Sequence, residues 1–364
     1  MANLLPGLLI CLLAVQTIQH DGNRTWTKTK TKGPPAIPKT FRGRTSKLNH
    51  TNSWLNVTSE DQVTAYTTGL LSTWVIPSSY ILAMLVGIPS NGYILTFLRL
   101  KAKSYSTAVL YLNLALSDLL LLLSLALRVH YHFNGNDWIF GEISCRLFTA
   151  LFYGNVYCSA QTIACISLKR YLAVVKPFLY RRLAKTTLAV WACLVVWFLY
   201  GAAIVPELLV KQSYHLTQLR ITTCHDVLPL DETSHSLLVP YRLMLVVLGF
   251  IVPFLICIYA HVAVVYHLGQ SHCDWRPFIR VSTLVFVIFV VCFLPSGILH
   301  FAHYIRLFCK EDGRLYGYYR VAVCLCCFHS CLDPFLCMLI SRTAASELQF
   351  ISFHGMPQRP AVMM

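Results

Sequence analysis

Charged residues are scarce in this chain of 364 residues: Asp, Glu, Lys and Arg together make up 12% of it. A soluble globular domain carries about 25%. Apolar residues reach 56% and the mean hydropathy is +0.58, so water is not the solvent of most of the chain. This composition excludes an arrangement of two or three soluble domains and indicates a membrane protein.

Enzyme motifs are missing as well. The sequence has no HExxH zinc motif, no GxSxG nucleophile elbow and no glycine-rich phosphate loop. We therefore expect a protein that is not an enzyme and that carries no cofactor. Acidic residues number 15 against 30 basic ones, which gives a net charge of +15. The basic residues lie in an N-terminal arm and in alternate loops rather than in one patch, so no nucleic-acid partner is predicted.

Seven long apolar stretches follow residue 73. A hydrocarbon core of about 30 Å needs about 20 apolar residues per helix. The predicted spans are 74–99, 107–132, 143–175, 187–209, 237–267, 277–306 and 316–341. They show no repeated halves, which disfavours a transporter. The sequence therefore predicts an all-α bundle of seven transmembrane helices over residues 74–342, surrounded by membrane lipid, with a cytoplasmic tail at 343–364.

The N-terminal arm has the features of a translocated segment. The apolar run 4–14 is too short to span a bilayer and is typical of the core of a signal peptide, residues 1–20. Three N-glycosylation sequons follow, at Asn23, Asn49 and Asn56. The arm is rich in charge and poor in aromatic residues, so we expect it to be disordered.

The distribution of basic residues predicts the orientation. Lys and Arg gather in the loops near 99–103, 176–185 and 276–280, whereas the alternate loops mix both signs. The positive-inside rule then makes the basic loops cytoplasmic and places the N-terminus outside the plasma membrane. Cys145 and Cys224 would lie on the oxidising side, where their location favours a disulfide.

Two carboxylates, Asp118 and Asp333, lie deep in the predicted spans, with Ser159 at a similar depth. An ionised group at the bilayer centre costs about 2.5–3.5 kcal/mol on insertion scales, so such residues usually face the bundle. One interpretation is a small cavity that binds a cation, such as sodium at Asp118 and Ser159. The other is a hydrogen-bond network that fixes the helix packing. The cysteines from Cys324 to Cys331 point in several directions on a helix and predict no metal site.

Motifs in all seven spans resemble the rhodopsin-type G-protein-coupled receptors. They occur in the right order along the chain: NLALSD, an arginine followed by tyrosine, CFLP and DP. The resemblance implies a receptor that couples to a heterotrimeric G protein. The activation-switch positions that it implies are Asp118, Ser159, Lys169, Arg170, Phe293, Pro295, Asp333 and Pro334.

A narrower resemblance concerns the second outer loop and the arm. ITTCHDVL at 221–228 is similar to the signature of the protease-activated receptors, and PKTFRG at 38–43 is similar to their cleavage site. The resemblance implies that thrombin or a related trypsin-like serine protease cuts between Lys39 and Thr40, with a role in blood coagulation. It divides the arm into an activation peptide, 21–39, and a ligand-bearing part, 40–73. The implied tethered ligand is Thr40, Phe41, Arg42 and Gly43.

The cleavage segment is chemically coherent by itself. Lys39 has the long cationic side chain that a trypsin-like pocket with a buried carboxylate accepts, and Pro38 keeps the chain extended. A new ammonium at Thr40 calls for anionic and aromatic groups in its binding pocket. The candidates are Glu207, His225, Asp226, Tyr316, Tyr318 and Tyr319. The alternative is a receptor for a diffusible peptide, in which the match at Lys39 is accidental.

Three positions depart from the family pattern at the inner end of the bundle. The acid expected before Arg170 is Lys169, and the tyrosines expected in the fifth and seventh spans are His261 and Cys337. All three serve one switch, which favours weak or absent autonomous signalling. The protein would then be a cofactor that presents protease to another receptor, as a heterodimer with a second protease-activated receptor. The alternative is a receptor that signals through compensating contacts.

Overall fold

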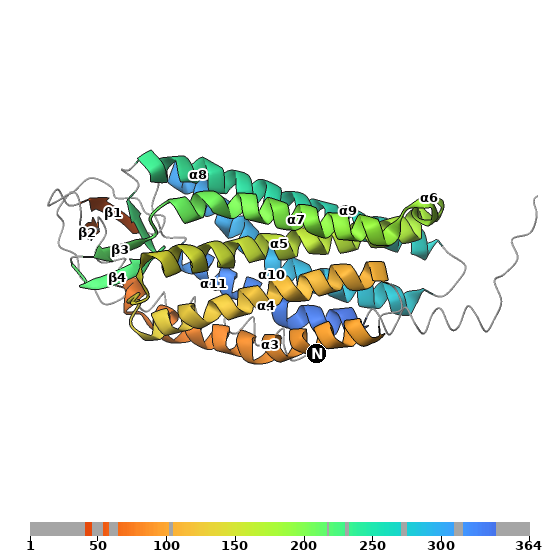
Figure 1. The fold of residues 1–364 in the computed structure, drawn as a ribbon, viewed down its shortest axis with the longest axis horizontal. Coiled ribbons are helices and arrows are strands. Elements are labelled where there is room, and N and C mark those ends of the chain that lie inside the picture. Colours follow the sequence, from red (N-terminus) through yellow and green to blue (C-terminus); the bar gives the residue numbers. More distant parts are fainter. Residues whose placement is uncertain are drawn as a thin grey trace, which may run out of the picture.

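The computed structural model describes residues 41–45, 54–57, 65–101, 105–216, 218–229, 233–270, 275–308 and 316–339. Its helices run side by side along the long axis of the molecule, and a small sheet lies at one end (Figure 1). The long helices are α3 (Ile76–Lys101), α4 (Tyr105–Phe133), α5 (Gly141–Val175), α7 (Lys185–Leu209), α9 (Val252–Gly269), α10 (Arg276–Phe308) and α11 (Tyr316–Cys327). The short α6 (Pro177–Arg182) connects α5 to α7 at the end away from the sheet.

Two π-helical turns modify the regular helices. η1 (Leu71–Val75) leads into α3, and η2 (Val247–Ile251) joins α8 (Thr233–Val246) to α9. A proline follows each turn by two residues, and its missing N–H removes a helical hydrogen bond at that place. Other prolines also lie inside helices: Pro89 in α3, Pro206 in α7, Pro240 in α8 and Pro295 in α10.

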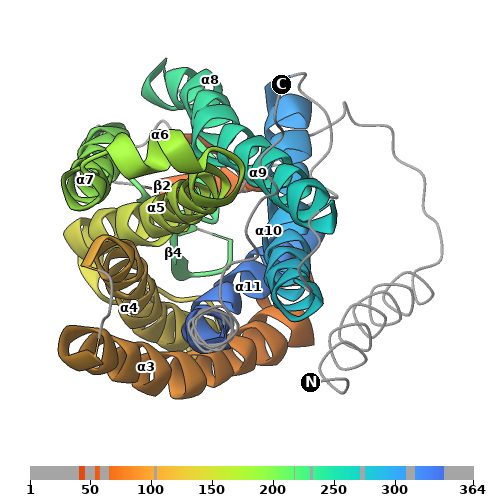
Figure 2. The same cartoon turned by 90° about the vertical axis from the view of Figure 1, so that its right-hand side faces the viewer.

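Six stretches among the described residues are long and apolar enough to cross a membrane. They are Leu71–Leu100, Ser106–Phe133, Lys185–Leu209, Pro240–Gly269, Arg276–His303 and Tyr316–Leu339, and each matches a predicted span. The remaining predicted span corresponds to α5, whose 35 residues extend over about 52 Å. α5 packs between α4, α7 and α9 (Figure 2), and it buries the polar residues Asn155, Ser159 and Thr162. This enclosed position explains why α5 is less apolar than the lipid-facing helices.

A five-stranded sheet joins the N-terminal arm to the loop between α7 and α8. Its strand order is β4-β3-β2-β1-β5. β3 (Ser213–Leu216) and β4 (Ile221–Cys224) form a hairpin, and β5 (Val227–Pro229) follows it. β1 (Phe41–Thr45) and β2 (Trp54–Val57) belong to the arm that the composition predicted to be disordered. They form strands because the loop supplies backbone partners on both sides, a nonlocal effect that composition does not reveal.

The pairing register fixes where the arm lies on the loop. β1 runs parallel to β5, with Phe41 opposite Val227 and Gly43 opposite Pro229. It runs antiparallel to β2, which in turn pairs with β3. The loop itself is held to the bundle by a disulfide between Cys224, at the end of β4, and Cys145, in the first turns of α5. β1 and β2 of the arm therefore lie on a covalently anchored loop.

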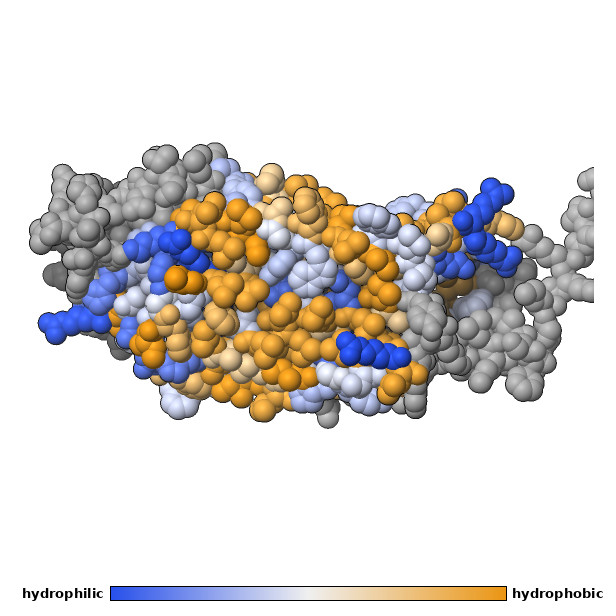
Figure 3. Space-filling model, in the orientation of Figure 1, coloured by the Kyte–Doolittle hydropathy of each residue, from blue (hydrophilic) through white to orange (hydrophobic). Residues whose placement is uncertain are grey.

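The two ends of the bundle differ in chemistry. Hydrophobic residues cover much of the middle of the visible face, and hydrophilic residues gather toward its ends (Figure 3). We call the end with the strands the sheet end. The opposite end, here called the basic end, carries exposed arginines and lysines in α6 and at the starts of α7 and α10: Arg181, Arg182, Lys185, Arg276 and Arg280.

The core is continuous along the bundle and includes the cysteines of α11. Near the sheet end, Cys324 and Cys327 pack with Tyr80, Leu121 and Phe152 between α3, α4 and α5. Further along, Cys326 packs on the side of α5, α9 and α10. Cysteine here fills space as a small apolar side chain, as predicted.

Candidate functional site

A buried acid, Asp226, anchors the loop to two helices at the sheet end. Asp226 is 1% exposed. The hydroxyl of Tyr131, on α4, donates a 2.7 Å hydrogen bond to its Oδ2. The hydroxyl of Tyr316, on α11, donates a 2.5 Å bond to its Oδ1. The Nη2 atom of Arg320 lies 3.8 Å from the same Oδ1, within ion-pair distance.

The charge state of this acid follows from its surroundings. Burial alone raises the pKa of Asp226, but the Arg320 guanidinium and the hydroxyls of Tyr316 and Tyr131 outweigh burial, and the net pKa is lowered. Arg320 is itself 1% exposed. The site therefore holds an ionised carboxylate beside a guanidinium in a place that solvent does not reach.

A second buried acid, Glu207 of α7, is fully engaged by Arg242 of α8. The Nε and Nη2 atoms of Arg242 each donate a 2.5 Å hydrogen bond, one to each carboxylate oxygen of Glu207. Gln212 adds a 3.0 Å bond from Nε2 to Oε2. This bidentate geometry is the strong form of a guanidinium–carboxylate contact. Glu207 thus lies at the sheet end of the bundle, but the guanidinium of Arg242 already balances the charge of its carboxylate.

His225 lines a small cavity beside this ion pair. Its Nδ1 lies 2.9 Å from the side-chain oxygen of Gln212, and its ring centre is 5.2 Å from that of Tyr153. His225 has a positive φ of 69°, a conformation that few residues other than glycine adopt. The cavity measures about 20 Å³ and is lined also by Glu207, Arg242 and His300. It has room for a water molecule and none for a peptide side chain, so a ligand requires the sheet end to open.

The tyrosines of α11 divide between two faces. Tyr316 and Tyr319 are buried and contact His303 of α10. Tyr318 is 38% exposed and points away from them. That Tyr318 lines the pocket together with the other two tyrosines stays a prediction.

The deep polar residues form a separate cluster in the middle of the bundle. The Ser159 hydroxyl donates a 3.1 Å hydrogen bond to Oδ1 of Asp118, and Nε2 of His329 lies 3.4 Å from the same oxygen. One ligand atom each from Asp118, His329 and Asp333 lies within 4.8 Å of the other two. This set mixes nitrogen with oxygen, whereas a hard cation such as sodium prefers oxygen alone. The predicted sodium ligands, Asp118 and Ser159, both offer oxygen and therefore fit a sodium ion, whereas the hydrogen bond between them fits a network; both interpretations stay predictions.

The activation-switch residues of α10 border this cluster. The Phe293 ring is completely buried and its centre is 4.3 Å from the centre of the His329 ring. Pro295 lies two residues further along α10, and Pro334 follows Asp333 in the helical segment 329–339. The helix kink at Pro295 and the polar cluster are thus in direct contact through Phe293.

Near the basic end, Lys169 and Arg170 have separate partners. Lys169 donates through Nζ to the hydroxyls of Ser106 and Thr107, at 2.9 and 2.5 Å. Arg170 donates through Nη2 to the Tyr111 hydroxyl at 2.7 Å. Hydroxyl groups of α4 therefore hold both cations, at the place where an acid was expected to restrain the arginine.

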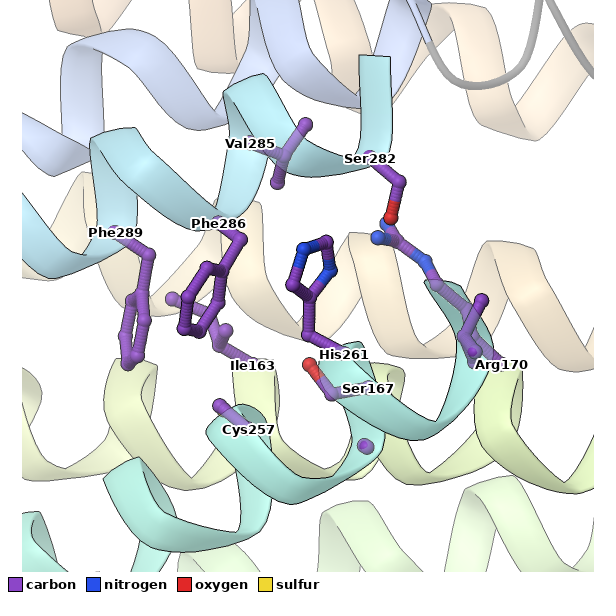
Figure 4. Close-up of a pocket in the computed structure, with 11 residues that line it drawn as sticks. Ile163, Ser167, Arg170, Cys257, His261, Ser282, Val285, Phe286 and Phe289 are labelled. Atoms are coloured by element: carbon purple, nitrogen blue, oxygen red, sulfur yellow. The ribbon is translucent and has the colours of Figure 1, made fainter. Parts of the chain in front are cut away.

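A cavity of about 40 Å³ opens beside Arg170, between α5, α9 and α10 (Figure 4). His261 of α9 projects into it and stacks on Phe286 of α10, with ring centres 4.4 Å apart. Ser167 and Ser282 supply the remaining polar groups of the lining. His261 occupies this space in place of the tyrosine that the family pattern predicts.

Sequence reasoning missed the buried cations at the sheet end. Arg128, Arg242 and Arg320 are each 5% exposed or less. The signal was present, because an arginine inside an apolar span is costly unless it has a partner. Four of the predicted site residues lie outside the described residues: Lys39, Thr40, Asn23 and Asn49. The third sequon residue, Asn56, lies in β2.

Comparison with known proteins gives one consistent result. The model of the 7 transmembrane receptor (rhodopsin family) matches residues 90–336. The chain is 42% identical to human proteinase-activated receptor 3 over 287 residues, which cover 79% of this chain and 77% of the relative. It is 36% identical to mouse proteinase-activated receptor 2 over 282 residues, 76% and 70% of the two chains. It is 33% identical to proteinase-activated receptor 1 of Xenopus laevis over 299 residues, 81% and 69% of the two chains.

Proposed function

Because this chain belongs to the proteinase-activated receptors of the rhodopsin family, we propose that a trypsin-like serine protease cuts its arm after Lys39 and exposes a tethered ligand that begins at Thr40. The observation that carries this proposal is the parallel pairing of β1 with β5. Residues 41–43, which form most of the implied ligand, already lie on the loop that supplies His225 and Asp226. Cleavage at residue 39 frees the chain directly before this strand.

The arm favours intramolecular binding. A tether converts the binding of the ligand into an event at about millimolar effective concentration, so even a weak ligand occupies its site. β2, downstream of β1, is held on the β3–β4 hairpin, which shortens the free part of the tether. The sheet end faces the outside of the plasma membrane in this proposal, since the basic end carries the cytoplasmic charge. Thrombin, acting in blood coagulation, is the proposed protease.

The test is N-terminal sequencing after thrombin treatment of cells that express the full chain with an epitope tag at its mature N-terminus. We expect loss of the tag and a new terminus Thr-Phe-Arg-Gly. Lys39→Ala abolishes both, whereas the matched control Lys32→Ala leaves both unchanged. A tag that survives thrombin and other trypsin-like proteases overturns the proposal. If the Lys39→Ala variant loses the tag as readily as the unmodified receptor, the cut lies at another residue, which also overturns cleavage after Lys39.

A second function, presentation of protease to another receptor of the same family, is favoured by the basic end. Arg170 is held by the hydroxyl of Tyr111, and His261 and Cys337 stand where tyrosines are expected. The receptor then binds the protease and is cleaved on the outside without driving a G protein on its own. Calcium responses to protease in cells that express only this receptor separate the two functions: a strong response abolished by Lys39→Ala excludes the pure cofactor.

A further inference from the structure

The buried charges at the sheet end do not balance. Three arginines there, Arg128, Arg242 and Arg320, are each 5% exposed or less. Two buried acids face them: Glu207 pairs with Arg242, and Asp226 pairs with Arg320. Among the described residues, no acid lies within ion-pair distance of Arg128. One buried positive charge therefore lacks a countercharge.

Arg128 also lacks hydrogen bonds. Its buried Nε has no partner, and no hydrogen bond joins its other nitrogens to the part of the chain that the structure describes. The guanidinium carbon lies 4.2 Å from the centre of the Phe152 ring. A ring face attracts a cation, but it supplies no lone pair for the N–H groups. The contact with Phe152 therefore offsets only part of the cost of burying this ionised group.

Other acids near the sheet end are too distant or already engaged. Asp118 is on the same helix as Arg128, but ten positions separate them, which is about 15 Å along the helix axis. Glu142 pairs with Arg146 and also accepts hydrogen bonds from backbone N–H groups at the start of the loop. The implied ligand, residues 40–43, contains no acid. The described residues and the implied ligand thus leave the countercharge of Arg128 to come from the medium.

Tyr153 borders both the guanidinium and a small cavity. Its ring centre is 5.8 Å from the guanidinium carbon of Arg128, and Tyr153 lines the cavity of about 20 Å³ beside His225. That volume suits a water molecule or a single-atom anion and excludes a peptide side chain. The buried Tyr80 hydroxyl, in the same core cluster as Phe152, is a second donor without a hydrogen-bond partner among the described residues. Unpaired buried donors beside an unbalanced positive charge favour a small anion as the occupant.

We propose that Arg128 is the anion-binding residue of the sheet end and that its ligand is chloride from the medium that faces this end. Chloride carries one negative charge and accepts several hydrogen bonds at once, so it satisfies both the charge and the N–H groups of Arg128. Bound there, it neutralises the third arginine as Glu207 and Asp226 neutralise the other two. The site goes beyond the proposed function, because neither cleavage nor the ligand strand takes part in it.

The experiment measures thermal unfolding of the purified, uncut, full-length receptor in sodium gluconate and in sodium chloride at equal concentration. The sodium concentration and the ionic strength are then the same, and only the anion changes. Because a ligand that binds the folded state stabilises it, we expect the midpoint of unfolding to be about 2–4 °C higher in chloride. In Arg128→Met, which keeps an unbranched side chain and removes its charge, we expect equal midpoints in the two salts.

Arg146→Gln is the matched control, because Arg146 lies at the same end, is partly exposed and already has an acid partner. We expect this variant to keep the full effect of chloride. Equal midpoints in the two salts for the unmodified receptor overturn the proposal, and so does a rise in chloride that Arg128→Met retains. These outcomes do not bear on cleavage after Lys39, which N-terminal sequencing tests separately.

A second measurement tests the site if Arg128→Met does not fold. Chloride that exchanges with a protein site gives a broadened chloride nuclear magnetic resonance signal. With the unmodified receptor we expect such broadening, and we expect bromide to reverse it by competition, whereas gluconate is too large for the site and leaves it unchanged. A signal without broadening, or one that bromide and gluconate affect equally, overturns the proposal.

Discussion

Two buried arginine–carboxylate pairs lie at the sheet end, and they differ in how closely the two charged groups contact each other. Glu207 and Arg242 share two short hydrogen bonds, one to each carboxylate oxygen. Asp226 and Arg320 share one longer contact, and two tyrosine hydroxyls supply the hydrogen bonds of the acid. We infer that the first pair holds α7 to α8 as a structural clamp.

The clamp interpretation makes a stability prediction at the scale of one residue. Arg242→Met leaves Glu207 buried without a cation and should lower the free energy of unfolding by about 3–5 kcal/mol. The double variant Glu207→Gln with Arg242→Met removes both charges and should recover most of that loss. Thermal unfolding of the purified receptor measures both. Equal destabilisation by the single and double variants would contradict the clamp interpretation.

At the scale of elements, β1 is an inner strand of the sheet, with β2 on one side and β5 on the other. An inner strand satisfies its backbone N–H and C=O groups in both directions. Strands of four or five residues have little stability of their own. The docking of β1 therefore depends on the anchored loop, whose disulfide and Asp226 contacts fix β4 and β5 in place.

This arrangement predicts slow amide hydrogen exchange in β1 before any cleavage. In the uncut receptor, amides of 41–45 should exchange more slowly than in a synthetic peptide of the same sequence, because exchange requires local opening of the sheet. Leu228→Pro, which removes a backbone N–H from β5, should reduce that protection. Mass-spectrometric hydrogen exchange measures both. Exchange at the peptide's rate in the unmodified receptor would show that the arm is not docked.

At the scale of the whole molecule, the helices were predictable and the strands were not. Apolar length locates six spans directly, and it also predicts α5 despite the polar residues in that helix. β1 and β2 depend on partner strands more than a hundred residues away in the chain. No local sequence pattern in the charged arm predicts these two strands.

The sequence indicates acidic residues for the candidate site, but it does not indicate which arginines pair with them. The acids Asp226 and Glu207 do lie buried at the sheet end, as expected of pocket residues. Their arginine partners come from other helices, and only the packed bundle shows that both charges are already matched. Sequence proximity alone also does not show which of Tyr316, Tyr318 and Tyr319 share a helix face.

Signalling through the bundle gives the third prediction. The cavity beside Arg170 contains His261, and Cys337 is buried in the adjoining part of the core. Restoring both tyrosines, as His261→Tyr with Cys337→Tyr, should increase the protease-induced calcium response in cells that express only this receptor, because phenol hydroxyls can then bridge the basic ends of the helices. Surface expression, measured by the epitope tag, is the control. An unchanged response at equal expression would place the limit on signalling elsewhere.

Under the proposed function, the ligand strand is part of the sheet, and this changes what the receptor measures. Each receptor molecule carries one copy of its own ligand, and dilution or washing cannot remove that ligand. The output of a cell then follows the cumulative number of bonds cut, rather than the concentration of anything dissolved outside. Such a receptor works once, and a cell resets its sensitivity only by replacing the used molecules with newly made ones.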